Sequence, residues 1–143
     1  MPVRAAELGD RELFERLLFD YLFEFDGRTD PYPYFDAYWS ETERLPFVIE
    51  DDGNAVGLCL VRVRDDGWSI AEFYVVPERR RGGLGRAAVE ALATLARSSG
   101  AEHLEAKVHP DNQKALPFWL SVGFVALDLP GVVITRRFLR TDG

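Results

Sequence analysis

Cysteine and histidine are scarce in this chain of 143 residues, which contains one cysteine, Cys59, and two histidines. A single cysteine excludes an internal disulfide, and so few soft ligands disfavour a structural zinc site, so we expect no metal. The sequence also lacks any run of about 20 apolar residues, the length that crosses a membrane. Its first residues turn acidic before any apolar run of signal-peptide length. We therefore expect a cytoplasmic protein without membrane contact.

Positive charge is scarce in the first third of the chain. Residues 1–50 hold 5 basic and 12 acidic side chains, whereas residues 51–143 hold 12 of each, so the whole net charge of −7 lies in the first third. An acidic protein gains nothing from counterion release at phosphates, and we expect no nucleic-acid partner. Where the acidic region lines a site it suits a cationic or amine ligand; otherwise it is a solvated surface that favours solubility.

The length and the hydrophobic fraction of 47% fit one folded domain over residues 1–143, with a core that needs no disulfide staple. Hydrophobic periodicity and turn signals predict helices at 10–25, shortly before 43, at 83–97 and at 112–122, and strands at 46–50, 55–64, 68–76, 103–108, 124–127 and 132–138. Three antiparallel strands followed by a strand–helix–strand crossover predict a mixed, mostly antiparallel sheet of the α/β (α+β) class.

A basic, glycine-rich turn stands between the third strand and the long helix. It reads Val75-Val76-Pro77-Glu78-Arg79-Arg80-Arg81-Gly82-Gly83-Leu84-Gly85-Arg86. Successive glycines let backbone N–H groups form a concavity, and the free N–H groups and dipole of the following helix favour a phosphate. The neighbouring arginines add positive charge that can reach phosphate oxygens. The turn therefore predicts a pyrophosphate site, with a merely flexible, soluble loop as the alternative.

Two common phosphate-binding motifs fit this turn poorly. The sequence has no Gly-Lys-Ser/Thr tripeptide, which a Walker loop requires. Residues 83–88 match the dinucleotide pattern GxGxxA, but six residues separate Val76 from Gly83 and three antiparallel strands come first. An NAD(P)-binding oxidoreductase is thus a weaker alternative.

The segment Arg80-Arg81-Gly82-Gly83-Leu84-Gly85 resembles the Arg/Gln-x-x-Gly-x-Gly/Ala signature of the GNAT superfamily of N-acetyltransferases, which binds the pyrophosphate of acetyl-CoA. Downstream, residues 108–115 and Gly123-Phe124 resemble the second conserved block of that superfamily. Motifs of the first third resemble a small bacterial branch of predicted acetyltransferases. The resemblance implies a GNAT-type acyl-CoA N-acyltransferase fold with a splayed parallel strand pair. It also implies direct transfer of an acetyl group from acetyl-CoA to a primary amine of a small molecule or peptide.

The resemblance also implies roles for individual residues. Backbone amides of the loop would hold the pyrophosphate, and the pantetheine arm would enter the gap beside the strand that precedes it. The residues so assigned to coenzyme A are Phe73, Val75, Arg80, Arg81, Gly82, Gly83, Gly85, Arg86, Asn112, Phe118 and Trp119. Phe73 and Tyr74 would flank the acetyl group, and a bulge in their strand leaves open which of the two faces it.

Acetyl transfer to an amine needs a base for the amine and a proton for the leaving thiolate. Glu72, a carboxylate in an apolar strand, is the candidate base because burial there would raise its pKa; a solvent-facing Glu and His109 are the alternatives. Trp119 stands where the superfamily usually has a tyrosine, and an indole N–H cannot supply the proton. Tyr74 is a substitute by proximity. The tryptophan also motivates the alternative of a non-catalytic coenzyme A-binding or regulatory module.

The acceptor is expected between the first two helices, where aromatic rings and carboxylates suit an ammonium group. The residues concerned are Tyr21, Glu24, Asp26, Tyr32, Tyr34, Asp36, Tyr38 and Trp39. The alternative is that the rings pack in the core and the acids are solvated. An exposed last strand could pair with a second copy, so monomer and homodimer both stay open.

Overall fold

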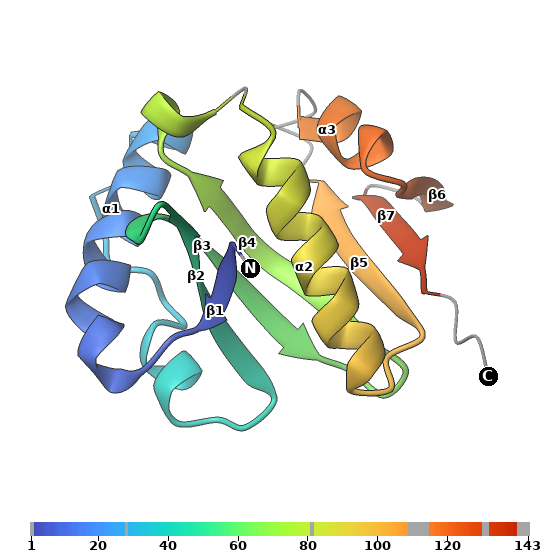
Figure 1. Cartoon of the computed structure of the whole chain (residues 1–143), viewed down its shortest axis with the longest axis horizontal. Coiled ribbons are helices and arrows are strands. Elements are labelled where there is room, and N and C mark those ends of the chain that lie inside the picture. Colours follow the sequence, from blue (N-terminus) through green and yellow to red (C-terminus); the bar gives the residue numbers. More distant parts are fainter. Residues whose placement is uncertain (1, 28, 81, 109–114, 130–131, 140–143) are drawn as a thin grey trace.

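A seven-stranded sheet forms the centre of the computed structural model, which describes residues 2–27, 29–80, 82–108, 115–129 and 132–139. In spatial order the strands are β1 (Val3–Ala5), β2 (Arg44–Asp51), β3 (Asn54–Val63), β4 (Gly67–Val75), β5 (His103–Val108), β7 (Val132–Phe138) and β6 (Val125–Leu129) (Figure 1). Every described neighbouring pair is antiparallel except β4–β5, which is parallel. The predicted mixed, mostly antiparallel sheet is confirmed.

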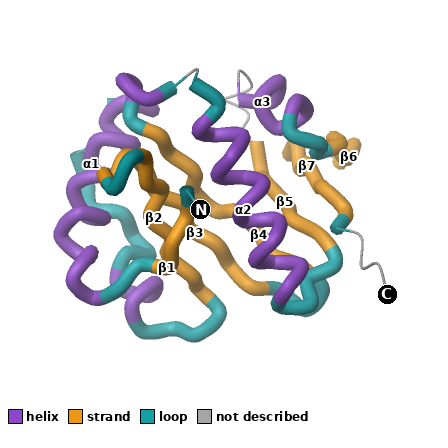
Figure 2. Tube along the Cα trace, in the orientation of Figure 1, coloured by secondary structure: helices purple, strands orange, loops and turns teal. Residues whose placement is uncertain are grey.

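Helices flank this sheet (Figure 2). The α-helices are α1 (Arg11–Asp26), α2 (Leu84–Ser98) and α3 (Leu116–Ser121), and the 3-10 turns are η1 (Leu8–Asp10), η2 (Asp36–Trp39) and η3 (Pro77–Arg79). Among the helices that the structure describes, none combines the length and the apolar character needed to cross a membrane.

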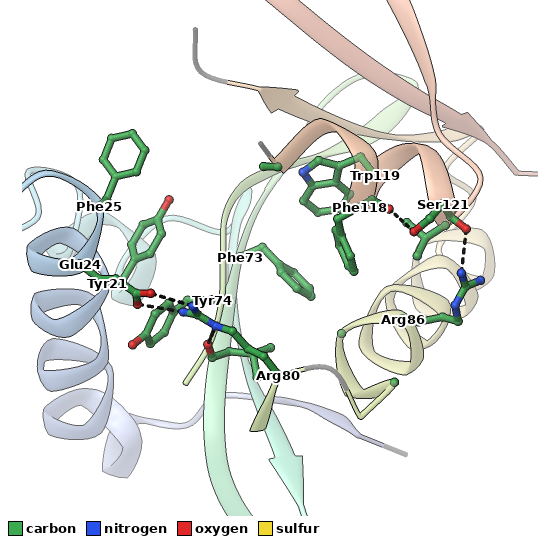
Figure 3. A pocket seen from close by; sticks show the side chains of 15 residues that line it. Tyr21, Glu24, Phe25, Phe73, Tyr74, Arg80, Arg86, Phe118, Trp119 and Ser121 are labelled. Atoms are coloured by element: carbon green, nitrogen blue, oxygen red, sulfur yellow. Dashed lines mark hydrogen bonds and ion pairs between the residues drawn. The ribbon is translucent and has the colours of Figure 1, made fainter. Parts of the chain in front are cut away.

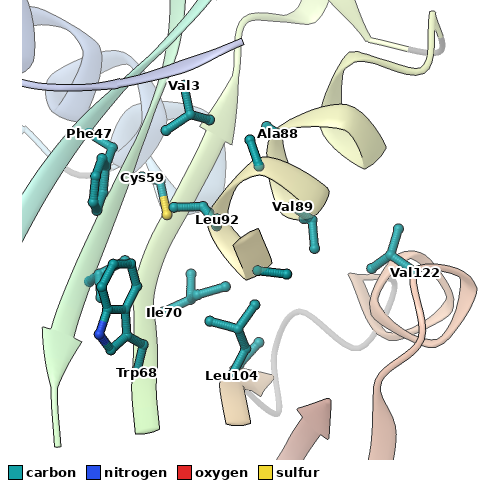
Figure 4. Close-up of a cluster of buried hydrophobic side chains, with 14 of the residues drawn as sticks. Val3, Phe47, Cys59, Trp68, Ile70, Ala88, Val89, Leu92, Leu104 and Val122 are labelled. Carbon is teal, nitrogen blue, oxygen red and sulfur yellow. The ribbon is translucent and has the colours of Figure 1, made fainter. Parts of the chain in front are cut away.

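Two hydrophobic cores cover the two faces of the sheet, because successive strand residues point to opposite sides. On β3, Cys59 and Val61 face α2 and belong to the larger core (Figure 4), whereas Leu58 and Leu60 pack against α1 and η2. Leu92 of α2 is completely buried in the larger core. We call these sides the α2 face and the α1 face.

Glycines set two helix boundaries. Gly27 adopts a left-handed φ of 75° and ends α1, with its N–H donating to Phe23 O at 2.8 Å. Gly83 adopts a φ of 84° directly before α2, and Ala87 N–H donates to its carbonyl at 3.0 Å. Only glycine takes up this conformation without strain, so the glycine-rich turn determines where α2 begins.

Three local expectations differ from the structure. Strand β1 was not predicted, because three residues are too few to show a periodicity. It pairs with β2 from Val3 opposite Ile49 to Ala5 opposite Phe47. The second helix is only the 3-10 turn η2, since the aromatic residues around it pack individually into the core. In the described residues the helix predicted at 112–122 begins at Leu116; residues 112–114 lie outside them.

Candidate active site

The parallel strands β4 and β5 separate at one end. Their pairing ends at Ile70 and Ala106, although β4 continues to Val75 and β5 to Val108. The upper part of β4 is therefore hydrogen-bonded to β3 on one edge and has no described strand on the other. This is the splayed parallel pair that the sequence resemblance implies.

The peptide groups at this free edge can be assigned from the neighbouring hydrogen bonds. Val76 N–H donates to Val56 O on β3 at 2.9 Å. Because peptide groups alternate along a strand, those of Phe73 and Val75 face the gap. The register also shifts here: Leu60 lies opposite Glu72 and Val61 opposite Ile70, which leaves Ala71 as a bulge. The expected bulge is confirmed.

A cavity of about 730 Å³ opens at this gap (Figure 3). Helix α1 contributes one wall, β4 the floor, and the glycine-rich turn with α2 and α3 the other wall. The lining residues are Tyr21, Glu24, Phe25, Phe73, Tyr74, Val75, Arg80, Gly83, Gly85, Arg86, Ala115, Phe118, Trp119, Ser121 and Val122. Its volume suits a cofactor-sized ligand, and its lining combines apolar rings with a few polar groups.

The start of α2 provides backbone donors to this cavity. Gly83 and Gly85 line it, and a Cβ on Gly85 would lie 3.3 Å from the Phe118 ring, so a side chain here would press against α3. The first N–H groups of a helix have no partner within the helix, and the helix dipole favours an anion there. Gly82 is exposed and does not line the cavity, and Arg81 lies outside the described residues.

The arginines of the turn bind protein groups. Arg80 donates to both carboxylate oxygens of Glu24 at 2.7 and 2.8 Å, and its Nε donates to Val75 O at 2.8 Å. Arg79 forms an ion pair with Asp51 at 2.8 Å, and Arg86 donates to Ser121 O at 3.0 Å. These contacts reduce the positive charge available to a ligand. They also connect α1, the end of β4 and the turn, which lie far apart in the sequence.

Aromatic rings form the wall on the α2 face. The Phe73 ring lies 5.8 Å from that of Phe118 and 5.5 Å from that of Trp119, centroid to centroid. Trp119 contacts Phe124 at 5.1 Å in an edge-to-face arrangement and is only 7% exposed. Trp119 therefore belongs both to the hydrophobic core and to the cavity lining.

Tyr74 points to the other face, towards α1. Its ring lies 5.4 Å from that of Tyr21, and the Arg80 guanidinium lies over it with Cζ 5.5 Å from the centroid. Burial raises the pKa of Tyr74, and the negative charge of Glu24 raises it further. The phenol therefore keeps its proton at neutral pH and can act as a hydrogen-bond donor in the cavity.

Glu72 lies two residues before Tyr74 and hence on the same α1 face, close to the cavity but not in its lining. It is half-buried, and its charge raises the pKa of both Tyr32 and Tyr38 after the larger contribution of burial. The carboxylate is therefore near both hydroxyls.

Only some of the residues predicted to bind the acceptor line the cavity. Tyr21 and Glu24 line the cavity, although Glu24 is bound to Arg80. Tyr38 is 4% exposed and Trp39 is half-buried against Phe14, and neither lines the cavity. In the same region, Tyr32 is half-buried, Tyr34 is exposed, and Asp36 pairs with Arg11. The side chain of Asp26 is not described, and His109 and Asn112 lie outside the described residues.

Four lining residues were not predicted: Phe25, Ala115, Ser121 and Val122. The spacing of residues along the predicted helices could have indicated three of them, Phe25, Ser121 and Val122. Phe25 follows Tyr21 by four residues, and Ser121 and Val122 follow Phe118 by three and four, so each pair shares a helix face. No group of three His, Cys, Asp or Glu side chains that could hold a metal ion occurs within the described residues.

Comparisons with known proteins agree with this geometry. The model of the acetyltransferase (GNAT) family matches residues 11–124, whereas a search of curated proteins finds no significant match. An acetyltransferase from Thermus thermophilus has a similar structure, with a TM-score of 0.80, 19% identity and coverage of 97% of this chain and 98% of that one. The PaiA N-acetyltransferase from Thermoplasma acidophilum, solved with coenzyme A, has a TM-score of 0.76 and 14% identity over 95% and 97% of the chains.

A GNAT acetyltransferase from Staphylococcus aureus is similar as well, with a TM-score of 0.79 and 14% identity over 96% and 98% of the chains. These three structures share the overall fold of this chain. The sheet differs from the parallel, doubly wound sheet of dinucleotide-binding proteins, which removes the support for an NAD(P) site. With a family model that spans most of its length, the chain belongs to the GNAT acetyltransferase family.

Proposed function

We propose that this protein transfers the acetyl group of acetyl-CoA directly to a primary amine. The observation that carries the proposal is the cavity at the gap between β4 and β5, which joins the free peptide groups of β4 to the glycine turn at the start of α2. Pantetheine can hydrogen-bond to the Val75 N–H, since Arg80 already occupies the Val75 carbonyl. PaiA N-acetyltransferase, which has a similar fold and was solved with coenzyme A, supports coenzyme A as the class of ligand.

The pyrophosphate would lie at the N-terminus of α2, next to Gly83 and Gly85, where backbone N–H groups face the cavity. The acetyl group would then lie near Phe73 and Tyr74, at the end of the cavity closest to Glu72. Aromatic rings on the α2 face exclude water from the thioester.

In the proposed reaction the amine nitrogen attacks the thioester carbonyl carbon, a C–N bond forms and the C–S bond breaks. Glu72 takes the proton that the amine loses, directly or through water. The coenzyme A thiolate leaves and receives a proton from water or from Tyr74. Trp119 contributes packing and no proton.

Calorimetric titration with acetyl-CoA tests the binding site, with NADP as the parallel ligand. We expect saturable binding of acetyl-CoA that weakens at least a hundredfold in Gly83→Glu, because a carboxylate would stand at the phosphate site in a left-handed conformation. The matched control is Gly100→Glu, which places the same residue at a glycine with φ of 94° at the other end of α2. Binding of NADP alone would contradict the proposal.

A coenzyme A-binding module without transferase activity is the second candidate, because Trp119 replaces the usual tyrosine. Release of free thiol from acetyl-CoA in the presence of amines distinguishes the two. Steady-state release above the rate of hydrolysis favours the enzyme, whereas tight binding without release by any amine favours the module.

A further inference from the structure

Arg62 on β3 is half-buried and has no hydrogen-bond or ion-pair partner among the described residues. Its Nε is inaccessible to water and has no hydrogen bond, and its guanidinium forms no ion pair within the described part of the chain. Arg136 and Arg137, which are similarly half-buried, pair with Glu105 and Glu90 at 2.9 and 2.8 Å. A partly desolvated charge is costly without an anion, and this protein has more acidic than basic residues to supply one.

A second arginine stands directly across the sheet. Arg44 of β2 lies opposite Arg62 in the register, and its side chain is only 10% exposed. Its guanidinium lies over the rings of Tyr34 and Tyr38, with Cζ 5.0 and 5.3 Å from their centroids, and its Nε lies 3.3 Å from Glu41. Like charges at opposite positions destabilise a sheet, so the stability of the fold does not explain why two arginines face each other here.

Both arginines lie on the α1 face, the face of Glu72. On β3, Arg62 follows Leu58 and Leu60 at intervals of two, and Leu60 lies opposite Glu72. Two residues of strand span about 7 Å, a distance that one small molecule with a group at each end can bridge.

The Tyr38 hydroxyl lies among these charges. Tyr38 is 4% exposed, and its hydroxyl interacts with the Arg44 guanidinium and with Tyr32, although neither contact reaches full hydrogen-bond geometry. The charges of Arg44 and Arg62 lower the pKa of Tyr38, and that of Glu72 raises it, while burial dominates. The Tyr38 hydroxyl, two guanidinium groups and the Glu72 carboxylate thus share the α1 face. They are not among the residues that line the cavity, but Glu72 lies two residues along β4 from Tyr74, which does line it.

On the basis of the proposed function, we propose that the acceptor is an amine that also carries a carboxylate. Arg62, assisted by Arg44 and the Tyr38 hydroxyl, binds the carboxylate, and the amine faces Glu72 and the thioester. Planar guanidinium groups bind carboxylates through paired hydrogen bonds, which also orient the ligand. The purely cationic acceptor that the acidic first third suggests fits less well, since Arg80 neutralises Glu24.

The test compares acceptors that differ only in the negative charge. Thiol release from acetyl-CoA is measured with glycine, β-alanine and γ-aminobutyrate, and with the carboxamide of each. We expect kcat/KM for at least one acid to exceed that for its carboxamide at least tenfold. The amine of a carboxamide is less basic and more often neutral, so this preference cannot come from the reactivity of the amine.

The variant Arg62→Gln should lower kcat/KM for the preferred acid at least tenfold and leave its carboxamide and the affinity for acetyl-CoA unchanged. The control Arg97→Gln removes the same charge from an exposed position on α2 and should change neither. Thermal unfolding of both variants shows whether the fold is retained, and the comparison of acids with carboxamides in the unchanged protein does not depend on it.

Acetyl-CoA binding without any preference for an acid would overturn this inference and leave the proposed function intact. A preference that survives Arg62→Gln in a folded variant would overturn it as well. Failure of acetyl-CoA to bind the unchanged protein would overturn both the proposed function and this inference.

Discussion

The two faces of strand β4 differ in how they are built. On the α2 face, Phe73 meets the rings of Phe118 and Trp119, all of which come from segments close to the glycine turn. On the α1 face, Glu72 and Tyr74 meet side chains that come from α1, η2, β2 and β3. Next to β4, the first face is apolar and its rings come from β4 and α3, whereas the second combines apolar side chains with the polar groups of Glu72, Tyr74 and Tyr38 and draws on four other elements.

The faces also differ in how well their polar groups are satisfied. Within the described residues, the buried side-chain atoms that lack full hydrogen-bond geometry are the Tyr38 hydroxyl, Trp39 Nε1 and Arg62 Nε, which lie near α1 and η2, and Arg136 Nε on the distant strand β7. Buried polar groups are usually paired, so a concentration of unpaired ones is typical of a site that awaits a ligand. In the proposed function, the α2 face would receive the apolar arm of the cofactor and the α1 face the polar acceptor.

The largest expected effect is on the α2 face, from Trp119→Ala. The substitution removes the contacts with Phe73 and Phe124 and leaves a cavity, so the free energy of unfolding should fall by about 3–5 kcal/mol. Denaturant unfolding measures this. Phe19→Ala, at a ring that is 47% exposed, should cost less than about 1 kcal/mol. Equal losses in the two variants would contradict the structural role of Trp119.

On the α1 face, Glu72→Gln should lower kcat by about 100- to 1000-fold, because a glutamine cannot accept the proton of the amine. The dissociation constant of acetyl-CoA should stay unchanged, since the proposed function places the cofactor against the other face. Steady-state kinetics and calorimetry check the two parts. Glu12→Gln, an exposed position on α1, is the control. A loss of acetyl-CoA affinity equal to the loss of kcat would contradict the assignment of the base and the cofactor to different faces of β4.

A smaller effect is expected from the ion pair that connects the faces. In Glu24→Gln, Arg80 loses its bidentate partner and is held less firmly on the Val75 carbonyl. Both side chains are 42% exposed, so acetyl-CoA affinity should fall only about threefold to tenfold, or roughly 1 kcal/mol. Asp51→Asn, which breaks the similarly exposed pair with Arg79, should leave the affinity unchanged. Tighter binding in Glu24→Gln would show that the ion pair opposes the ligand.

The smallest effect lies at the base of α1. Arg4 and the Glu7 N–H hold the pKa of Asp10 at about 2, below its ordinary value of 3.8. A lowered pKa stabilises the fold above the unfolded value, and this stabilisation is lost as the pH falls from about 4 to 2. Asp10→Asn should therefore destabilise the protein by about 0.5–1 kcal/mol at neutral pH.

Urea unfolding at several pH values checks this prediction, and the difference between Asp10→Asn and the unchanged protein should vanish near pH 2. The control is Glu15→Gln, at an exposed position on α1. A difference that is constant over the whole pH range would mean that Asp10 acts by a contact other than its charge.

Much of the cofactor side could be predicted because its signals are local. The glycines place the start of α2, the strand–turn–helix order places the cavity beside β4, and Phe73, Val75, Gly83, Gly85 and Trp119, which were predicted to contact coenzyme A, all line it. The acceptor side could be predicted only in part. Tyr21 and Glu24 line the cavity, whereas Tyr38 and Trp39 do not, and Tyr38 enters the proposed acceptor site only through its hydroxyl. Nothing local in the sequence singles out Arg62.

The sequence by itself determined the family, the order of most elements and the turn at Gly83, because periodicity, glycine conformation and motif spacing are properties of neighbouring residues. Only the tertiary structure decided which charges meet. Arg80 forms an ion pair with Glu24, which lies 56 residues away in the sequence. The bulge at Ala71 determines the face of the sheet to which each following residue of β4 points. A shift of one residue in register reverses the faces of a strand, so long-range pairing, and not local preference, places Glu72 and Arg62 on the same side.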